Sequence, residues 1–201
     1  MINNYNALPL GTFLELDEVF RLDAEEIDKQ VKIVAILANL TEDEVLALPL
    51  DNYASMAAQT AFLSEECPPV TAPARVIVGE LVLVPVKDFT KLTTAQYVDF
   101  QTFSKGGTAK LPELLSVLLV PEGKKYNEGY DIADVVKAVR SLSLPVALGL
   151  SAFFFDSLRK SIEASLTSLE ETTKRIPKEK RRELLKTVER LLRTAGAGSE
   201  M

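Results

Sequence analysis

The residues with the clearest chemical potential are the carboxylates around position 130. Glu128, Asp131 and Asp134 lie within seven residues of one another, and hard divalent cations bind clustered oxygen ligands. The same spacing also suits a helix that begins near residue 131, because acidic side chains in a first turn favour the helix dipole. We favour helix capping for these carboxylates, and we interpret Glu42 to Glu44 in the same way. The sequence therefore predicts no metal site.

The composition removes most other catalytic arrangements. The chain has no histidine, no tryptophan and one cysteine, Cys67. Histidine is the commonest general base near neutral pH and a frequent metal ligand. A Ser-His or Cys-His nucleophile is therefore impossible, and a zinc site would lack its usual ligands. We expect no enzymatic activity and no cofactor.

Two glycine-containing stretches could suggest phosphate binding. Gly123-Lys124-Lys125 and Gly106-Gly107 both lack the glycine spacing of a P-loop. The first is typical of a solvated turn and the second of a helix stop.

The C-terminal segment carries the most unusual charge pattern. Between Lys174 and Arg193 nine Lys or Arg face three Glu, a local charge of +6 in a chain of net charge −6, which leaves −12 elsewhere. Residues 173–201 are predicted to form an amphipathic basic helix, with Pro177 in its first turn and leucines on one stripe, followed by a flexible end. Its candidate partner-binding residues are Lys178, Arg181, Arg182, Leu184, Leu185, Val188, Leu191 and Leu192.

Such a helix has three possible uses. It can pack on the acidic body or on a partner protein, lie on a membrane, or contact nucleic acid. The leucine stripe favours packing, and the absence of interleaved aromatics disfavours stacking on single strands. Nucleic acid remains the alternative partner.

A second candidate partner-binding site is the aromatic run Phe153-Phe154-Phe155. Three adjacent side chains on a helix cannot share one face, so the helix that contains them must be buried on several sides or meet a partner.

The strongest strand signal is the stretch of residues 75–86, in which two β-branched runs flank Gly79-Glu80. Gly79 permits the positive φ that a two-residue hairpin turn requires. We predict one β-hairpin, whose second strand ends at Pro85 or lies on an edge. A lone hairpin is marginal in water, so it must lie on helices or pair with another chain.

The rest of the chain predicts helices. Capping boxes are expected at Thr41 to Glu44 and at Thr93 to Gln96, and acidic residues are expected to cap a helix at residues 23–26. Val31 to Leu37 should be central, because it is apolar almost all round, and Leu111 to Val120 should form one short buried helix. Leu92, Tyr97, Phe100 and Phe103 are predicted to face the core.

The predicted fold is mainly α (α+β). Its parts are a helical unit at 1–63, a proline-rich linker and hairpin at 64–91, a second helical unit at 92–172, and a basic amphipathic helix with a flexible end at 173–201. A weak echo between residues 8–16 and 92–100 makes a duplicated helical unit possible.

The sequence also bears on localisation. No apolar run reaches the roughly 18 residues of a membrane span, and the start has no signal-peptide pattern. An intracellular protein without membrane contact is expected.

Four stretches resemble a known family. LPLGTFLEL, VKIVAILANLTEDEVLALPLDNY, KLTTAQYVDFQTFSK and ELLSVLLVPEGKKYNEGYD are similar to tail assembly chaperones and small virion-associated proteins of tailed bacteriophages. The resemblance covers residues 8–160 and does not include the basic segment. It implies a helical, non-enzymatic protein of the host cell cytoplasm or the virion that binds phage structural proteins. A homo-oligomer and a nucleic-acid-associated packaging role stay open.

Overall fold

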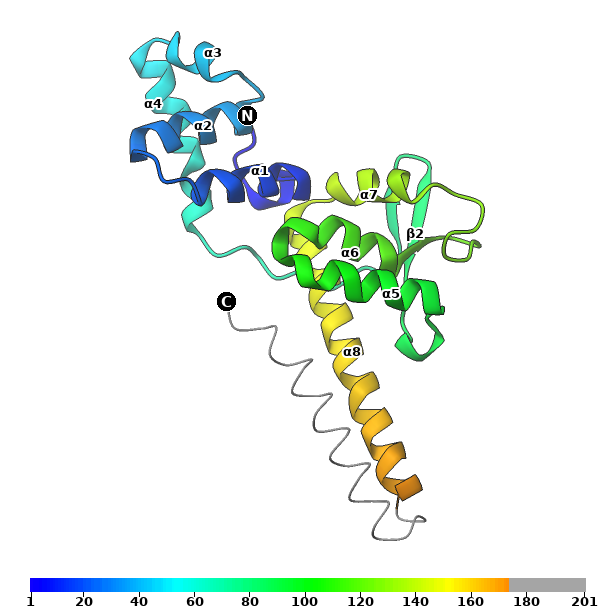
Figure 1. Ribbon diagram of the computed structural model, residues 1–201. Coiled ribbons are helices and arrows are strands. Elements are labelled where there is room, and N and C mark those ends of the chain that lie inside the picture. The colour runs from blue at the N-terminus through cyan, green and yellow to red at the C-terminus, as the bar shows by residue number, and fades with distance from the viewer. Residues whose placement is uncertain (174–201) are drawn as a thin grey trace. The chain divides into compact units, whose positions relative to one another are not determined.

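The computed structural model describes residues 1–173, and the first four α-helices form one group within it. They are α1 (Leu10–Phe20), α2 (Glu26–Ala38), α3 (Glu42–Leu46) and α4 (Leu50–Ala58), and a 3-10 turn follows at Gln59–Ser64. Helix α2 packs against α1, α3 and α4 (Figure 1). Its buried residues are Val31, Ile33, Val34, Ala35 and Leu37. The predicted central position of this apolar stretch is confirmed.

The helix starts in this group differ in how they are capped. At Thr41 the capping box is complete: the Glu44 N–H donates to the hydroxyl, and the Glu44 carboxylate accepts from the Thr41 N–H. At Glu25, the N-cap of α2, the side chain makes no capping bond. The predicted carboxylate cap at 23–26 is therefore wrong as a hydrogen bond, and its acids act only through their charge in the first turn.

A second group surrounds α6 (Leu111–Leu118), which packs against α5 (Thr94–Phe103) and α7 (Ile132–Arg140). A 3-10 segment at Ser104–Lys110 joins α5 to α6, and Gly107 breaks it with φ 59°. Seven of the eight residues of α6 are buried. This helix is the centre of the second group.

The predicted hairpin exists as β1 (Val76–Val78) and β2 (Leu81–Pro85), with Ile77 opposite Val82. Gly79 has φ 58° at the turn, and β2 ends at Pro85 as expected. A third strand, β3 (Leu119–Pro121), pairs antiparallel with β2, which makes β2 the middle strand. The mainly α fold with a small antiparallel sheet is confirmed.

The third strand corrects the predicted helix over Leu111 to Val120. The helix ends at Leu118, and Leu119 is already extended with φ −112° and ψ 104°. Because Pro121 disfavours helical backbone at Val120, the chain leaves the helix and its backbone pairs with the open side of β2.

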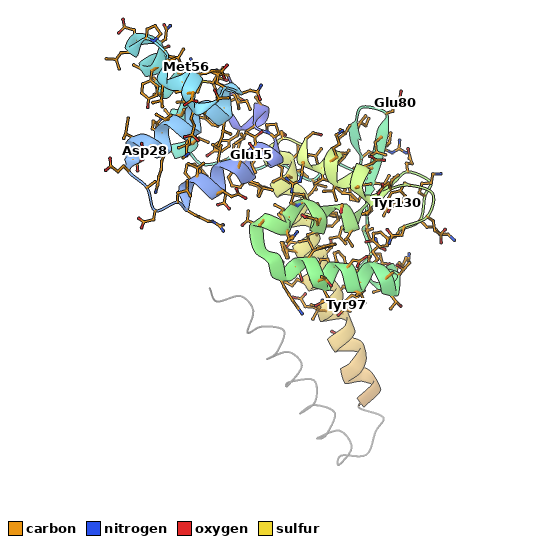
Figure 2. All side chains as sticks on the ribbon, turned by 45° about the horizontal axis from the view of Figure 1, so that its top comes forward. Glu15, Asp28, Met56, Glu80, Tyr97 and Tyr130 are labelled. Carbon is orange, nitrogen blue, oxygen red and sulfur yellow. The ribbon has the colours of Figure 1, made fainter. Side chains whose placement is uncertain are left out.

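Helix α5 contains two further corrections. Tyr97 is 52% exposed rather than directed to the core, and Figure 2 shows it on the outer side of the helix. At Thr93 only half of the capping box forms, because the Gln96 side chain is buried and donates to the Val117 carbonyl at 2.7 Å. The inward position beside Phe100 is taken by Gln96.

A short backbone pairing joins the two groups. The Leu10 N–H donates to the Leu142 carbonyl at 2.7 Å, and the Leu144 N–H donates to the Leu8 carbonyl at 2.8 Å. Pro9 lies opposite Ser143 between these bonds. Helix α1 also packs against α7.

The long helix α8 (Leu144–Thr173) belongs to two compact units. The first consists of residues 1–87 and 92–154, and the second of residues 88–91 and 155–201. The predicted domain boundaries and the duplication stay predictions. The predicted basic helix lies outside the described residues.

Candidate partner-binding surfaces

The three adjacent phenylalanines occupy different environments on α8. Phe154 is 3% exposed, Phe153 is half-buried, and Phe155 is 56% exposed. The rings of Phe153 and Phe154 pack edge to face with centroids 5.4 Å apart. Phe154 is therefore a core side chain, while Phe155 is open to a partner.

The other predicted partner-binding residues lie in the basic segment. Lys178 to Leu192 falls outside the described part of the chain, so the structure places none of the eight.

The carboxylates near residue 130 cap a helix. The Asp131 side chain accepts a hydrogen bond from the Ala133 N–H at 2.9 Å, and Asp134 lies in the first turn of α7. Within residues 1–173, no three acidic or cysteine side chains gather in a way that could hold a metal ion.

Tyr126 anchors the loop before α7, a role that the sequence analysis missed. Its hydroxyl donates to the Asp99 carboxylate on α5 at 2.7 Å, and its side chain is buried. Burial first, and then this hydrogen bond and the Asp99 charge, raise the pKa of Tyr126. The neighbouring Tyr130, labelled in Figure 2, accepts from the Asn127 N–H at 3.3 Å. The loop is tied to the body, and both tyrosines have structural roles.

Cys67 is half-buried in the proline-rich segment. Burial raises the pKa of its thiol, so little reactive thiolate is present at neutral pH.

A hollow of about 460 Å³ lies between α1, α2 and the start of α3. Its apolar lining comes from Val19, Leu22, Ala35, Ile36 and Leu40, and its polar lining from Glu15, Glu18, Lys32, Thr41 and Glu42. Leu22 is 42% exposed. Figure 2 labels Glu15 on α1. We call this site the acid-rimmed groove.

The charges around the acid-rimmed groove are mostly negative. Residues 1–63 contain eleven Asp or Glu against three Lys or Arg. Two of these cations are already paired, Arg21 with Asp17 and Lys32 with Glu42. Among the described residues, Glu15 and Glu18 have no cationic partner in an ion pair. The groove therefore presents apolar surface beside uncompensated carboxylates.

A second hollow, of about 570 Å³, lies between the hairpin turn and α7. Its lining is mainly apolar, from Val78, Leu81 and Ala138, with Glu80, Asp134, Lys137 and Ser141 at its edges. Here Lys137 offsets part of the acidic charge, so the charge at this hollow is more balanced.

Comparison with protein-family models, with curated proteins and with solved structures finds no match to this chain.

Among the described residues, no helix combines the length and apolarity needed to cross a lipid bilayer.

The acid-rimmed groove was not predicted from the sequence. One signal was present in the sequence: Phe20 and Leu22 are apolar residues in an acidic stretch. In the structure both side chains are exposed, Phe20 by 45%. An apolar residue left outside the core in this way can mark a binding surface.

Proposed function

We propose that this chain is a non-enzymatic binding protein of phage assembly or of the virion, and that it binds other phage structural proteins. The resemblance to tail assembly chaperones supports the class of partner. The acid-rimmed groove supports the mode of binding, because it combines the exposed Leu22 and the half-buried Ile36 and Leu40 with the unpaired Glu15 and Glu18.

The groove is complementary to a particular kind of segment. Apolar side chains of a partner would cover Leu22, Ile36 and Leu40, as an amphipathic helix covers a hydrophobic groove. Lys or Arg beside those side chains would face Glu15 and Glu18. Such rim charges raise association rates and select partners more than they add affinity.

Affinity capture tests this proposal. The tagged chain is expressed in the cells that naturally make it, and the captured proteins are identified by mass spectrometry. We expect virion structural proteins to be enriched. Leu22→Asp should reduce that enrichment at least about tenfold, because the partner would bury the new charge in the apolar lining of the groove.

The matched control is Leu50→Asp. Leu50 is 79% exposed and does not line the groove, so this variant should capture the same proteins as the wild type. If both variants retain the virion proteins equally, the groove is not the binding site. If no virion protein is enriched by the wild type, the proposed partner class is wrong.

A further inference from the structure

The edge strand β1 has one residue whose backbone groups both face its free edge. The Val82 carbonyl accepts from the Glu122 N–H at 2.8 Å, so the backbone of Val82 faces β3. In an antiparallel ladder both backbone groups of a residue face the same neighbour, and the direction alternates along the strand. Ile77, which lies opposite Val82 in β1, therefore directs its N–H and its carbonyl away from β2. Within residues 1–173, no strand pairs with that edge.

The other edge of the sheet is closed by the chain itself. By the same alternation, Leu119 and Pro121 in β3 direct their backbone away from β2. The Leu119 N–H is already bonded to the Leu115 carbonyl, and proline has no N–H. The Pro121 carbonyl accepts from the Lys124 N–H at 3.0 Å. The edge at which a further strand can join the sheet is therefore that of β1.

The side chains around Ile77 also form an apolar surface. Ile77 is 70% exposed, while Val82, Val84 and Val120 lie on the same face of the sheet and are half-buried. A solvated sheet face normally carries polar side chains, and free edges are normally protected by lysine or proline. The strand Val76–Val78 contains neither. Both its backbone and its side chains therefore favour pairing with another strand.

We propose that β1 of a second copy of this chain occupies this edge, antiparallel to the first, with Ile77 of both copies on a twofold axis. Each Ile77 N–H then donates to the Ile77 carbonyl of the other copy, so one surface serves both partners, as a twofold interface requires. The two three-stranded sheets join into one. Its two ends are the closed edges of β3, so assembly stops at the dimer. No residue of this surface lines the acid-rimmed groove, and the inference is independent of the proposed function.

The charges beside β1 favour a second copy in this orientation. Arg75 precedes Ile77 by two residues, and Glu80 follows it by three. Antiparallel pairing brings each Arg75 close to Glu80 of the other copy, whereas parallel pairing would bring like charges together. Glu80, labelled at the hairpin turn in Figure 2, is exposed and forms no ion pair among the described residues. Arg75 is paired with Glu122, but its side chain is 63% exposed, and a guanidinium has donors for a second carboxylate.

Cysteine cross-linking in the full chain tests the position of the axis. Cys67 is the chain's one cysteine, so Cys67→Ser gives a cysteine-free background for Ile77→Cys. Cα atoms of a hydrogen-bonded antiparallel pair lie about 5.5 Å apart, within the range that a disulfide spans. The control is Leu50→Cys, because Leu50 is 79% exposed and lies far from β1 in sequence. We expect nuclease-treated Ile77→Cys to form disulfide-linked dimers at least about tenfold faster than the control.

Ile77→Pro tests the two hydrogen bonds across the axis. Because the Ile77 N–H does not donate to β2, proline should leave the hairpin intact, which thermal melting checks, while it removes the donor from each copy. Sedimentation equilibrium at physiological salt measures dimerisation. A weak dimer is expected for the wild type, since small interfaces are typically weak. Ile77→Pro should raise its dissociation constant at least about tenfold, and Ile77→Val, which keeps the N–H, should leave it close to the wild-type value.

Three results would overturn the proposal. Equal cross-linking rates for Ile77→Cys and Leu50→Cys would place the second copy elsewhere. A wild type that is monomeric at every concentration would leave the edge to a different partner. A dimer that Ile77→Pro does not weaken would not depend on the Ile77 backbone. If Ile77→Pro does not fold, the cross-linking comparison decides, because Ile77→Cys retains the backbone donor.

Discussion

At the scale of single residues, Gly149 shows how closely the proline-rich segment lies on α8. A Cβ atom at this position would overlap the Val70 carbonyl group and also contact the Ala72 N–H. Both partners are backbone atoms of an extended segment, so neither can move aside as a flexible side chain would. The glycine is required for this close approach and not for its φ angle.

Gly149→Ala should therefore destabilise the protein, although alanine is normally the better helix former. We expect a loss on the order of 1–3 kcal/mol, typical of overpacking, and thermal melting measures it. Ser151→Ala is the control on the same helix, since the Ser151 hydroxyl bonds only to the Ala147 carbonyl within α8. An unchanged midpoint for Gly149→Ala would mean that the linker is not held against the helix.

Tyr126 gives a pH-dependent prediction at the same scale. The folded state raises the pKa of its hydroxyl above 10.0, so the folded chain keeps a proton that the unfolded chain releases at lower pH. The resulting stabilisation is present below about pH 10 and is lost as the pH rises further. Tyr126→Phe should cost about 1–2 kcal/mol at pH 8.

Urea unfolding of wild type and Tyr126→Phe at pH 8 and pH 11 measures this effect. The difference in unfolding free energy between the two proteins should shrink at pH 11. Above about pH 10 the wild type releases the Tyr126 proton when it unfolds, which favours unfolding, and phenylalanine has no such proton. Tyr5 and Tyr130, whose pKa values are also raised, are present in both proteins and cancel. A constant difference across this range would contradict the role of the hydroxyl.

At the scale of elements, Gln96 determines how α5 sits on α6. Its amide donates to the Val117 carbonyl. This carbonyl is one of the last in α6, so it has no partner within its own helix. The side chain is 4% exposed, so this one polar contact satisfies two buried groups at once. The consequence is that Tyr97 and Val98 turn outward, with 52% and 54% of their surface exposed.

Gln96→Leu keeps the volume but leaves the Val117 carbonyl without a donor. A loss of about 1–3 kcal/mol is expected, the usual cost of an unsatisfied buried acceptor, and chemical unfolding measures it. Gln101→Leu on the exposed side of α5 is the control, with little expected change. If Gln96→Leu is as stable as the wild type, the buried amide does not hold α5 in place.

The elements also show which features the sequence could predict. The Thr41 capping box and the Gly79 hairpin depend on residues within a few positions, and both were predicted correctly. The third strand and the orientation of Tyr97 depend on partners more than 20 residues away, Val84 for Val120 and Val117 for Gln96. The acid-rimmed groove joins three elements, so its residues have no shared local pattern.

At the scale of the whole molecule, charge is segregated along the chain. Residues 1–63, which include the groove, carry eleven carboxylates against three cations, and residues 174–193 carry nine cations against three carboxylates. A duplex laid across the acidic part would be repelled, so a broad nucleic-acid surface is disfavoured. The basic segment is the part of the chain that would bind nucleic acid under the alternative function.

A gel shift with duplex DNA at physiological salt separates the two functions. We expect no retention, since charges farther apart than about 8 Å are screened there. Tight binding that weakens with salt and disappears in the Arg181→Glu, Arg182→Glu variant would instead favour the packaging role, because each neutralised phosphate releases counterions. In the absence of binding, charge reversal at these two positions should have only modest effects on stability.

The backbone pairing of Leu8 and Leu10 with residues 142–144 also sets an order of events during synthesis. The two segments are more than 130 residues apart, so at about 5–20 residues per second the ribosome needs roughly 7–27 s to make the second after the first. Helices α1 to α4 can pack together during that interval, because their mutual contacts are closer in sequence. The amino end leaves the ribosome first, yet it reaches its final pairing only after α7 has been made.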